Sequence, residues 1–190
     1  MASQSATSVR WTTRDLEVLP HNEWTTYEII DGELFVTRSP HRRHQQISGK
    51  IFSVLDAWSA RSDLGEPIIA PGIILSDADN VIPDVVWITS ERLALIEDEA
   101  GHLTGMPELV IEILSSGEQN IRRDREAKLK LYSVQGAQEY WIVDRFTKRL
   151  EIYHRENAQL VLQATLETAD TLNSPLLPDF SCQVEQFFGK

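Results

Sequence analysis

Residues 81–90 read VIPDVVWITS and residues 107–115 read PELVIEILS, and these two stretches decide the fold. Each is an apolar run bounded by proline and polar residues, which is typical of a strand covered on both faces. Each also contains a carboxylate, Asp84 in the first and Glu112 in the second. An ionised carboxylate in a protein interior costs several kcal/mol unless it is paired, hydrogen-bonded or bound to a metal. The two acids therefore require partners that the rest of the sequence must supply.

The composition predicts one globular domain. The chain has 190 residues, of which 42% are hydrophobic, enough to bury a core. Its single cysteine, Cys182, excludes an internal disulfide framework and a cysteine-based zinc site. The polar start MASQSATSVR has no signal-peptide pattern, and no apolar run is long enough to span a membrane. We expect a cytoplasmic protein without membrane association, with a flexible tail over residues 1–12 and a single domain over residues 13–190.

Turn signals and periodicity predict the order of the elements. Residues 12–20 form a short helix that ends at Pro20, and Asp31-Gly32 is the turn of a hairpin over residues 26–38. The later elements are a helix over 44–58, strands over 67–75, 81–89 and 107–114, a helix over 120–136, a strand over 139–144, a hairpin of 149–156 with 159–166, and a short last helix. This order predicts an α/β sandwich with a mixed central β-sheet flanked by helices and with an N-terminal β-hairpin.

The two acids can meet on one face of this sheet. Side chains alternate along a strand, so Glu112 shares a face with Val110 and Leu114. If the strand that contains Asp84 lies beside it, the two carboxylates converge. Oxygen ligands of this kind suit Mg²⁺ or Mn²⁺, which keep several water ligands. Such a metal polarises a phosphodiester and lowers the pKa of an attacking water.

A lysine completes the candidate site. In the helix over 120–136, Lys128 shares the sheet-facing stripe with Ile121, Leu131 and Tyr132, whereas Lys130 lies on another face. Lysine is almost never fully buried without a partner. Close to a developing phosphate anion, its charge would stabilise the transition state.

These motifs together resemble a known family. The acids and the stretches YEIIDGEL, PDVVWIT, PELVIEILS, KLKLYSVQGAQEYWIVD and SPLLPDFSCQVEQFF are similar to the Uma family of "putative restriction endonucleases", within the PD-(D/E)XK nuclease superfamily, from about residue 13 to residue 188. The resemblance implies a restriction-endonuclease-like fold, a homodimer, and Asp84, Glu112 and Lys128 as catalytic residues. Leu114 stands where the general motif has lysine, and the matching lysine in this family lies in the next helix, at Lys128.

Structural explanations of the acids remain open. Asp84 could cap a strand end, and Glu112 could be ion-paired with a helix arginine such as Arg125. Glu28 and Glu33 flank the hairpin turn and are expected to be solvated, although Glu33 could serve as a third acidic ligand.

Two basic windows oppose the overall acidity. The formal charge is −11, but residues 38–50 and 122–130 carry +4 and +3. If the two windows rim one cleft, they would bind DNA phosphates. The candidate phosphate-binding residues are Arg42, Arg43, His44, Arg122 and Arg123.

The sequence thus predicts a divalent-metal-dependent endonuclease that hydrolyses DNA. The alternative is a non-catalytic module that keeps the nuclease fold and binds protein or nucleic acid. The acids and Lys128 favour the enzyme, and the acidic surface favours the module.

Overall fold

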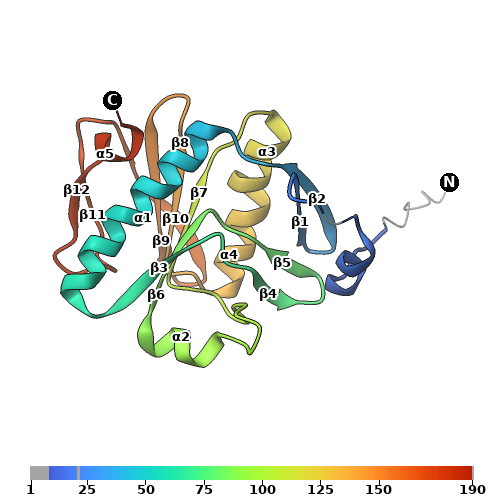
Figure 1. Ribbon diagram of the computed structural model, residues 1–190. Helices are drawn as coiled ribbons and strands as arrows, with labels where there is room; N and C mark the ends of the chain where they lie inside the picture. The colour runs from blue at the N-terminus through green and yellow to red at the C-terminus, as the bar shows by residue number, and fades with distance from the viewer. Residues whose placement is uncertain (1–8, 21, 190) are drawn as a thin grey trace.

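The structure is a computed structural model that describes residues 9–20 and 22–189, shown in Figure 1. The helical segments are η1 (Thr13–Val18, a 3₁₀-helix), α1 (Arg42–Ser62), α2 (Ser90–Ile96), α3 (Glu118–Arg122), η2 (Arg123–Lys128, a π-helix), α4 (Leu129–Gln135) and α5 (Glu185–Phe188). The strands are β1 (Thr25–Ile30), β2 (Glu33–Arg38), β3 (Gly65–Ile69), β4 (Ile73–Ser76), β5 (Asp79–Val81), β6 (Val85–Thr89), β7 (Leu109–Ile113), β8 (Glu139–Asp144), β9 (Arg149–Glu156), β10 (Gln159–Leu166), β11 (Thr171–Asn173) and β12 (Ser181–Gln183). None of these helices is both long and apolar enough to cross a membrane.

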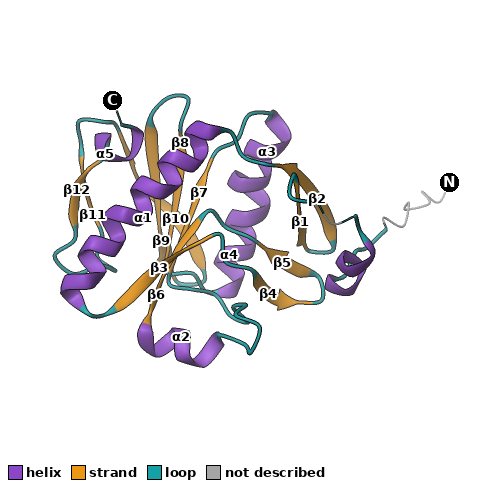
Figure 2. Cartoon of the chain, viewed as in Figure 1, coloured by secondary structure: helices purple, strands orange, loops and turns teal. Residues whose placement is uncertain are grey.

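A six-stranded sheet with the order β10-β9-β8-β7-β6-β3 forms the centre of the molecule, as Figure 2 shows. Strands β7 and β8 are parallel, and the other neighbours are antiparallel. The parallel pair requires a crossover, which the α3–η2–α4 helix supplies. The predicted mixed central sheet flanked by helices is therefore confirmed.

The two faces of this sheet bury separate cores, as alternation along β7 requires. Leu109, Ile111 and Ile113 belong to the core that contains α1 and α5. Val110 and Leu114 belong to the core that contains the α3–η2–α4 helix and the hairpin. Glu112 shares the second face, so its side chain points toward the helix that carries Lys128.

Two predicted strands are each broken in the structure. The predicted strand over 67–75 is split into β3 and β4, because Ala70 has a positive φ of 49° and Pro71 cannot donate to a sheet. The predicted strand over 81–89 is split by Pro83 into β5 and β6. Strands β4 and β5 instead join the N-terminal hairpin in a four-stranded sheet with the order β2-β1-β5-β4. Asp84 therefore lies in the link between the two sheets, directly before β6.

The last described residues before η1 contact the hairpin. Within the predicted tail over 1–12, residues 1–8 lie outside the described chain. The Trp11 amide donates to the Gly32 carbonyl at 2.8 Å, and Arg10 is ion-paired with Asp31 at 3.0 Å.

Candidate active site

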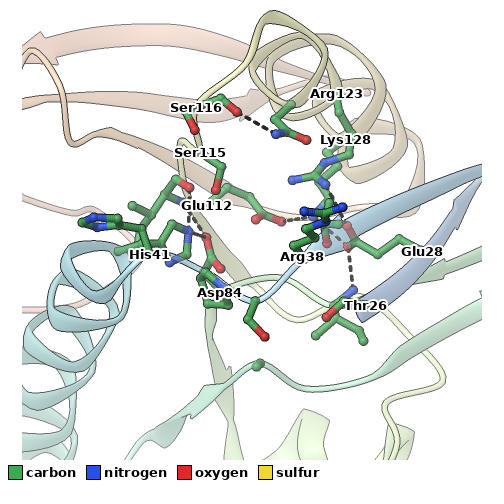
Figure 3. Close-up of a pocket in the computed structure, with 18 of the residues that line it drawn as sticks. Thr26, Glu28, Arg38, His41, Asp84, Glu112, Ser115, Ser116, Arg123 and Lys128 are labelled. Atoms are coloured by element: carbon green, nitrogen blue, oxygen red, sulfur yellow. Dashed lines mark hydrogen bonds and ion pairs between the residues drawn. The ribbon is translucent and has the colours of Figure 1, made fainter. Parts of the chain in front are cut away.

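A cavity of about 610 Å³ lies where the two sheets and the two main helices meet. Figure 3 shows acidic and basic side chains converging on it. The hairpin contributes Glu28, and β7 contributes Glu112. The link before β6 contributes Asp84, and the α3–η2–α4 helix contributes Arg123 and Lys128. The structure thus brings together three residues predicted to act in catalysis, from three elements far apart in the sequence.

Asp84 is held at the edge of the cavity by the main chain of β7. Its Oδ2 accepts a hydrogen bond from the Ile113 amide at 2.7 Å. His44, on the first turn of α1, places Nε2 at 3.2 Å from the same oxygen and at 2.8 Å from the Ile113 carbonyl oxygen. The side chain of Asp84 remains 23% exposed, whereas that of His44 is buried. Asp84 therefore has a structural role, because it joins the strand ends, and its carboxylate is also partly open to the cavity.

Glu112 and Lys128 form a buried ion pair. Lys128 Nζ donates to Glu112 Oε1 at 2.8 Å, and the Tyr132 hydroxyl donates to the same oxygen at 2.8 Å. Glu112 and Lys128 are 2% and 1% exposed. Lys130, two residues further along the helix, is exposed. The spacing argument that separated the two lysines is therefore confirmed for their burial.

The expected solvation of Glu28 is wrong, because the hairpin directs this side chain into the same cluster. Glu28 Oε1 lies 2.8 Å from Lys128 Nζ and accepts from the Ile82 amide at 2.9 Å. Arg123 lies 3.4 Å from the other oxygen of Glu28 and 2.8 Å from Asp124. Breaking one partner out of such a buried network typically costs about 3–5 kcal/mol. Ion pairs between charged side chains around the cavity thus hold the hairpin against the helix.

Burial is the main cause of the shifted pKa values in this cluster. Burial raises the pKa of Glu112 to about 8; the Lys128 ammonium opposes this rise, and the Asp84 carboxylate adds to it. Burial also raises the pKa of Asp124 above its ordinary value. Burial disfavours the Lys128 ammonium, but the carboxylates of Glu112 and Glu28 outweigh it and raise the pKa of Lys128. The lysine is therefore charged at every physiological pH.

His44 responds to two opposing influences. Burial lowers its pKa, but the hydrogen bond to Asp84 and the charge of that carboxylate outweigh burial. The pKa of His44 consequently lies above its ordinary value of 6.5. The His44 side chain contacts Asp84 and the main chain of β7, and it is not on an open surface.

The residues present fit a divalent cation. The second oxygen atoms of Asp84 and Glu112 make no hydrogen bond with another described residue, and both side chains line the cavity. Within the described ranges, no three His, Cys, Asp or Glu side chains are close enough to hold a metal by themselves. Main-chain carbonyls and waters would supply the remaining ligands, as is common for Mg²⁺.

The formal charges around the cavity balance. The acids are Glu28, Asp84, Glu112 and Asp124, and the cations that line the cavity or pair with these acids are Arg38, Arg123, Lys128 and Arg145. A divalent cation at Asp84 and Glu112 would favour the ionised form of Glu112.

The predicted phosphate-binding residues divide between three places. His44 and Arg123 line the cavity, but both are buried and engaged by acids or by β7. Arg42 and Arg43 are exposed and line a neighbouring cleft. Arg122 is exposed and ion-paired with Glu126 at 2.8 Å, beside a different pocket. Both basic windows therefore contribute to this cavity, and the first window adds the exposed Arg38, whereas Arg42, Arg43 and Arg122 lie outside it.

The structure also decides two other expectations about the acids. Glu33 is exposed, which confirms its expected solvation, and it lines other pockets than the cavity of Asp84 and Glu112, which argues against the alternative of a third ligand. Arg125 is ion-paired with Glu151, so it is not the partner of Glu112. The missed residues are Glu28 and Tyr132. Because Tyr132 lies one helical turn after Lys128, spacing could have assigned it to the site; nothing local distinguishes Glu28 from a solvated hairpin acid.

A family model with the description "Putative restriction endonuclease", that of Uma2, matches residues 13–185. The chain belongs to the Uma2 family. The resemblance inferred from the motifs is thereby confirmed. No curated protein matches the chain.

A solved structure with similar architecture is described as a "putative nuclease belonging to DUF820 from Anabaena variabilis ATCC 29413". It is 18% identical to this chain, covers 93% of this chain and 97% of its own, and has a TM-score of 0.72. At this identity the likeness shows the fold, and it confirms the predicted nuclease-like sandwich of this Uma2 protein.

Proposed function

We propose that this protein hydrolyses DNA phosphodiester bonds with a divalent metal ion, Mg²⁺ or Mn²⁺, held by Asp84 and Glu112. The observation that carries the proposal is the position of the Lys128 ammonium, 2.8 Å from Glu112, on the wall of the cavity that Asp84 also lines. Family membership supports the same class of reaction. Since Leu114 occupies the usual lysine position, a cation had to come from another element, and the helix supplies it.

Each residue has a distinct role in this proposal. A bound divalent ion would polarise the phosphodiester and lower the pKa of a water molecule. The Lys128 ammonium would stabilise the negative charge that develops on the phosphoryl oxygens. Tyr132 and Glu28 are positioning residues, because the first orients the Glu112 carboxylate and the second holds the Lys128 ammonium at the cavity.

The first experiment is a metal titration with a conservative variant. Asp84→Asn retains an oxygen that can accept from the Ile113 amide but removes the charge. We expect wild type to bind Mn²⁺ in calorimetry and Asp84→Asn to lose this binding. Asp56→Asn makes the same change on the exposed side of α1 and should bind like wild type. Equal Mn²⁺ affinity of wild type and Asp84→Asn would remove the metal site.

The second experiment measures hydrolysis directly. Wild type is incubated with Mg²⁺ or Mn²⁺ and plasmid DNA, single-stranded DNA or RNA. Cleavage of DNA that disappears in Asp84→Asn is the expected result. Metal and DNA binding without cleavage would instead identify a non-catalytic module. A homodimer would supply two sites for the two strands of a duplex, which sedimentation analysis tests.

A further inference from the structure

A second cleft, of about 350 Å³, adjoins the catalytic cavity. Its walls come from the first turns of α1, the turn between β8 and β9, and the end of α5 with Gly189, which lie together in Figure 1. The cations that line it are Arg42, Arg43, Lys50, Arg145 and Lys148. No acidic side chain lines it within the described chain. In a chain of formal charge −11 this concentration of positive charge is unusual.

The other pockets do not share this character. The pocket beside α4 combines Lys130 with Asp31, Glu33 and Asp79, and the pocket beside α3 combines Arg122, Arg123 and Lys130 with Glu33 and Glu126. Acids therefore offset cations in both of these pockets. Of the three, the basic cleft is the one that is lined by cations without acids, which makes it the most complementary to an anion.

Arg145 connects the cleft to the catalytic cavity, because it lines both. Its Nε donates to the Leu114 carbonyl at 3.2 Å, and its guanidinium lies 4.1 Å from the centre of the Phe146 ring. These contacts fix the side chain to the end of β7, directly after Glu112 and Ile113. A phosphate at Arg145 would therefore be close to a phosphate at the catalytic acids.

Two details of the backbone place lysines on the cleft. Lys148 has a positive φ of 56°, a conformation that glycine or asparagine adopts more easily than lysine. Gly189 leaves room for Lys50, since a Cβ atom at this position would lie 2.0 Å from Lys50 Nζ. Both lysines reach the same concave surface, where several cations can contact one chain.

We propose that this cleft binds the phosphate backbone of the DNA strand on one side of the bond that is cut. The inference rests on the proposed function, which supplies DNA as the substrate. It assigns the path that the DNA strand follows away from the catalytic cavity. Arg42 and Arg43 belong to this path, whereas Arg122 and Arg123 do not, since their charges are paired with acids elsewhere.

The test is DNA binding by the double variant Lys50→Ala/Lys148→Asn. Asparagine tolerates the backbone conformation at position 148. Fluorescence anisotropy with a labelled DNA oligonucleotide, single-stranded or duplex, is measured in EDTA so that no cleavage occurs. The matched control Arg61→Ala/Lys130→Ala removes the same charge from exposed positions outside the cleft.

The expected loss follows from counterion release. Each phosphate contact contributes about 0.7 to the salt slope for single strands and about 0.9 for duplex DNA. At 0.1 M salt, loss of two contacts weakens binding by about 25-fold and 60-fold respectively, and lowers the slope by about 1.4 and 1.8. The control should bind like wild type. Circular dichroism confirms that both variants are folded.

The outcomes separate the cleft from the catalytic proposal. If wild type cleaves DNA and the cleft variant binds DNA as tightly as wild type, the path is wrong and the catalytic site is unaffected. If wild type cleaves nothing but the cleft variant still loses DNA binding, the cleft is correct and the hydrolysis is not. An equal loss of DNA binding in the control variant would also contradict the proposal, because the loss would then be explained by the change in net charge alone.

Discussion

Replacing Glu112 with glutamine should remove a loss of stability that wild type undergoes as the pH rises. The amide oxygen can still accept from Lys128 and Tyr132, but the buried negative charge is gone. In wild type, burial raises the pKa of Glu112 from 4.5 to about 8. Between these values the folded state keeps a proton that the unfolded state releases, so wild type loses stability as pH rises through this range. One pKa unit corresponds to about 1.4 kcal/mol, so the full cost is about 5 kcal/mol above pH 8.

Urea unfolding at pH 5.5 and pH 8.5 measures this cost. From the two pKa values, the free energy of unfolding of Glu112→Gln should gain about 3 kcal/mol relative to wild type between these pH values. His44 and Asp124, whose pKa values are also raised, are present in both proteins, but Asp124 interacts with Glu112, so loss of the Glu112 charge also favours the ionised form of Asp124. Glu126→Gln is the control, since Glu126 is exposed and its ion pair with Arg122 contributes little. A difference between Glu112→Gln and wild type that stays constant with pH would refute the burial argument.

Two further substitutions test the site and the fold. Lys128→Ala should lower the rate of cleavage by on the order of 10²-fold or more. It should also destabilise the fold by about 3–5 kcal/mol, because buried carboxylates lose their partner. Lys130→Ala should change neither the cleavage rate nor the stability, which cleavage assays and urea unfolding would show. Gly65→Ala would place a Cβ atom 2.1 Å from the Ile88 carbonyl oxygen, so thermal unfolding should shift down by about 6–12 °C, for a cost of about 3 kcal/mol. At Gly49, in α1, an added Cβ atom would have no neighbouring atom within 4 Å. Gly49→Ala should therefore raise the melting temperature slightly, because alanine favours a helix more than glycine does. Equal melting temperatures for the two glycine variants would contradict this account.

Local patterns predicted most of the fold. Alternation in PELVIEILS placed Glu112 opposite the face of Ile111 and Ile113, as the two cores show. Helical spacing buried Lys128 and exposed Lys130. Local patterns were misleading where one apolar run serves two sheets. Pro71 and Pro83 marked those breaks, but the length of the apolar runs outweighed them in the prediction.

The site was less predictable, because its ion pairs join distant segments. Whether Lys128 meets Glu28 depends on how the hairpin docks on the helix, which neither local pattern specifies. The same is true of Arg123, whose basic neighbours suggested an exposed phosphate contact, although its charge is used by Glu28 and Asp124. The net charge of a sequence window is thus a poorer guide to phosphate binding than the ion pairs that each of its residues makes.

The burial of Lys128 also affects its reactivity as an amine. A labelling reagent needs a neutral amine in contact with solvent, and Lys128 is 1% exposed with its pKa raised by two carboxylates. It can react only when a local opening separates the ammonium from its carboxylate partners and brings it into solvent. Lys130, on the same helix but exposed, reacts without such an opening. The ratio of the two labelling rates therefore reports how often the two acids lose their cation.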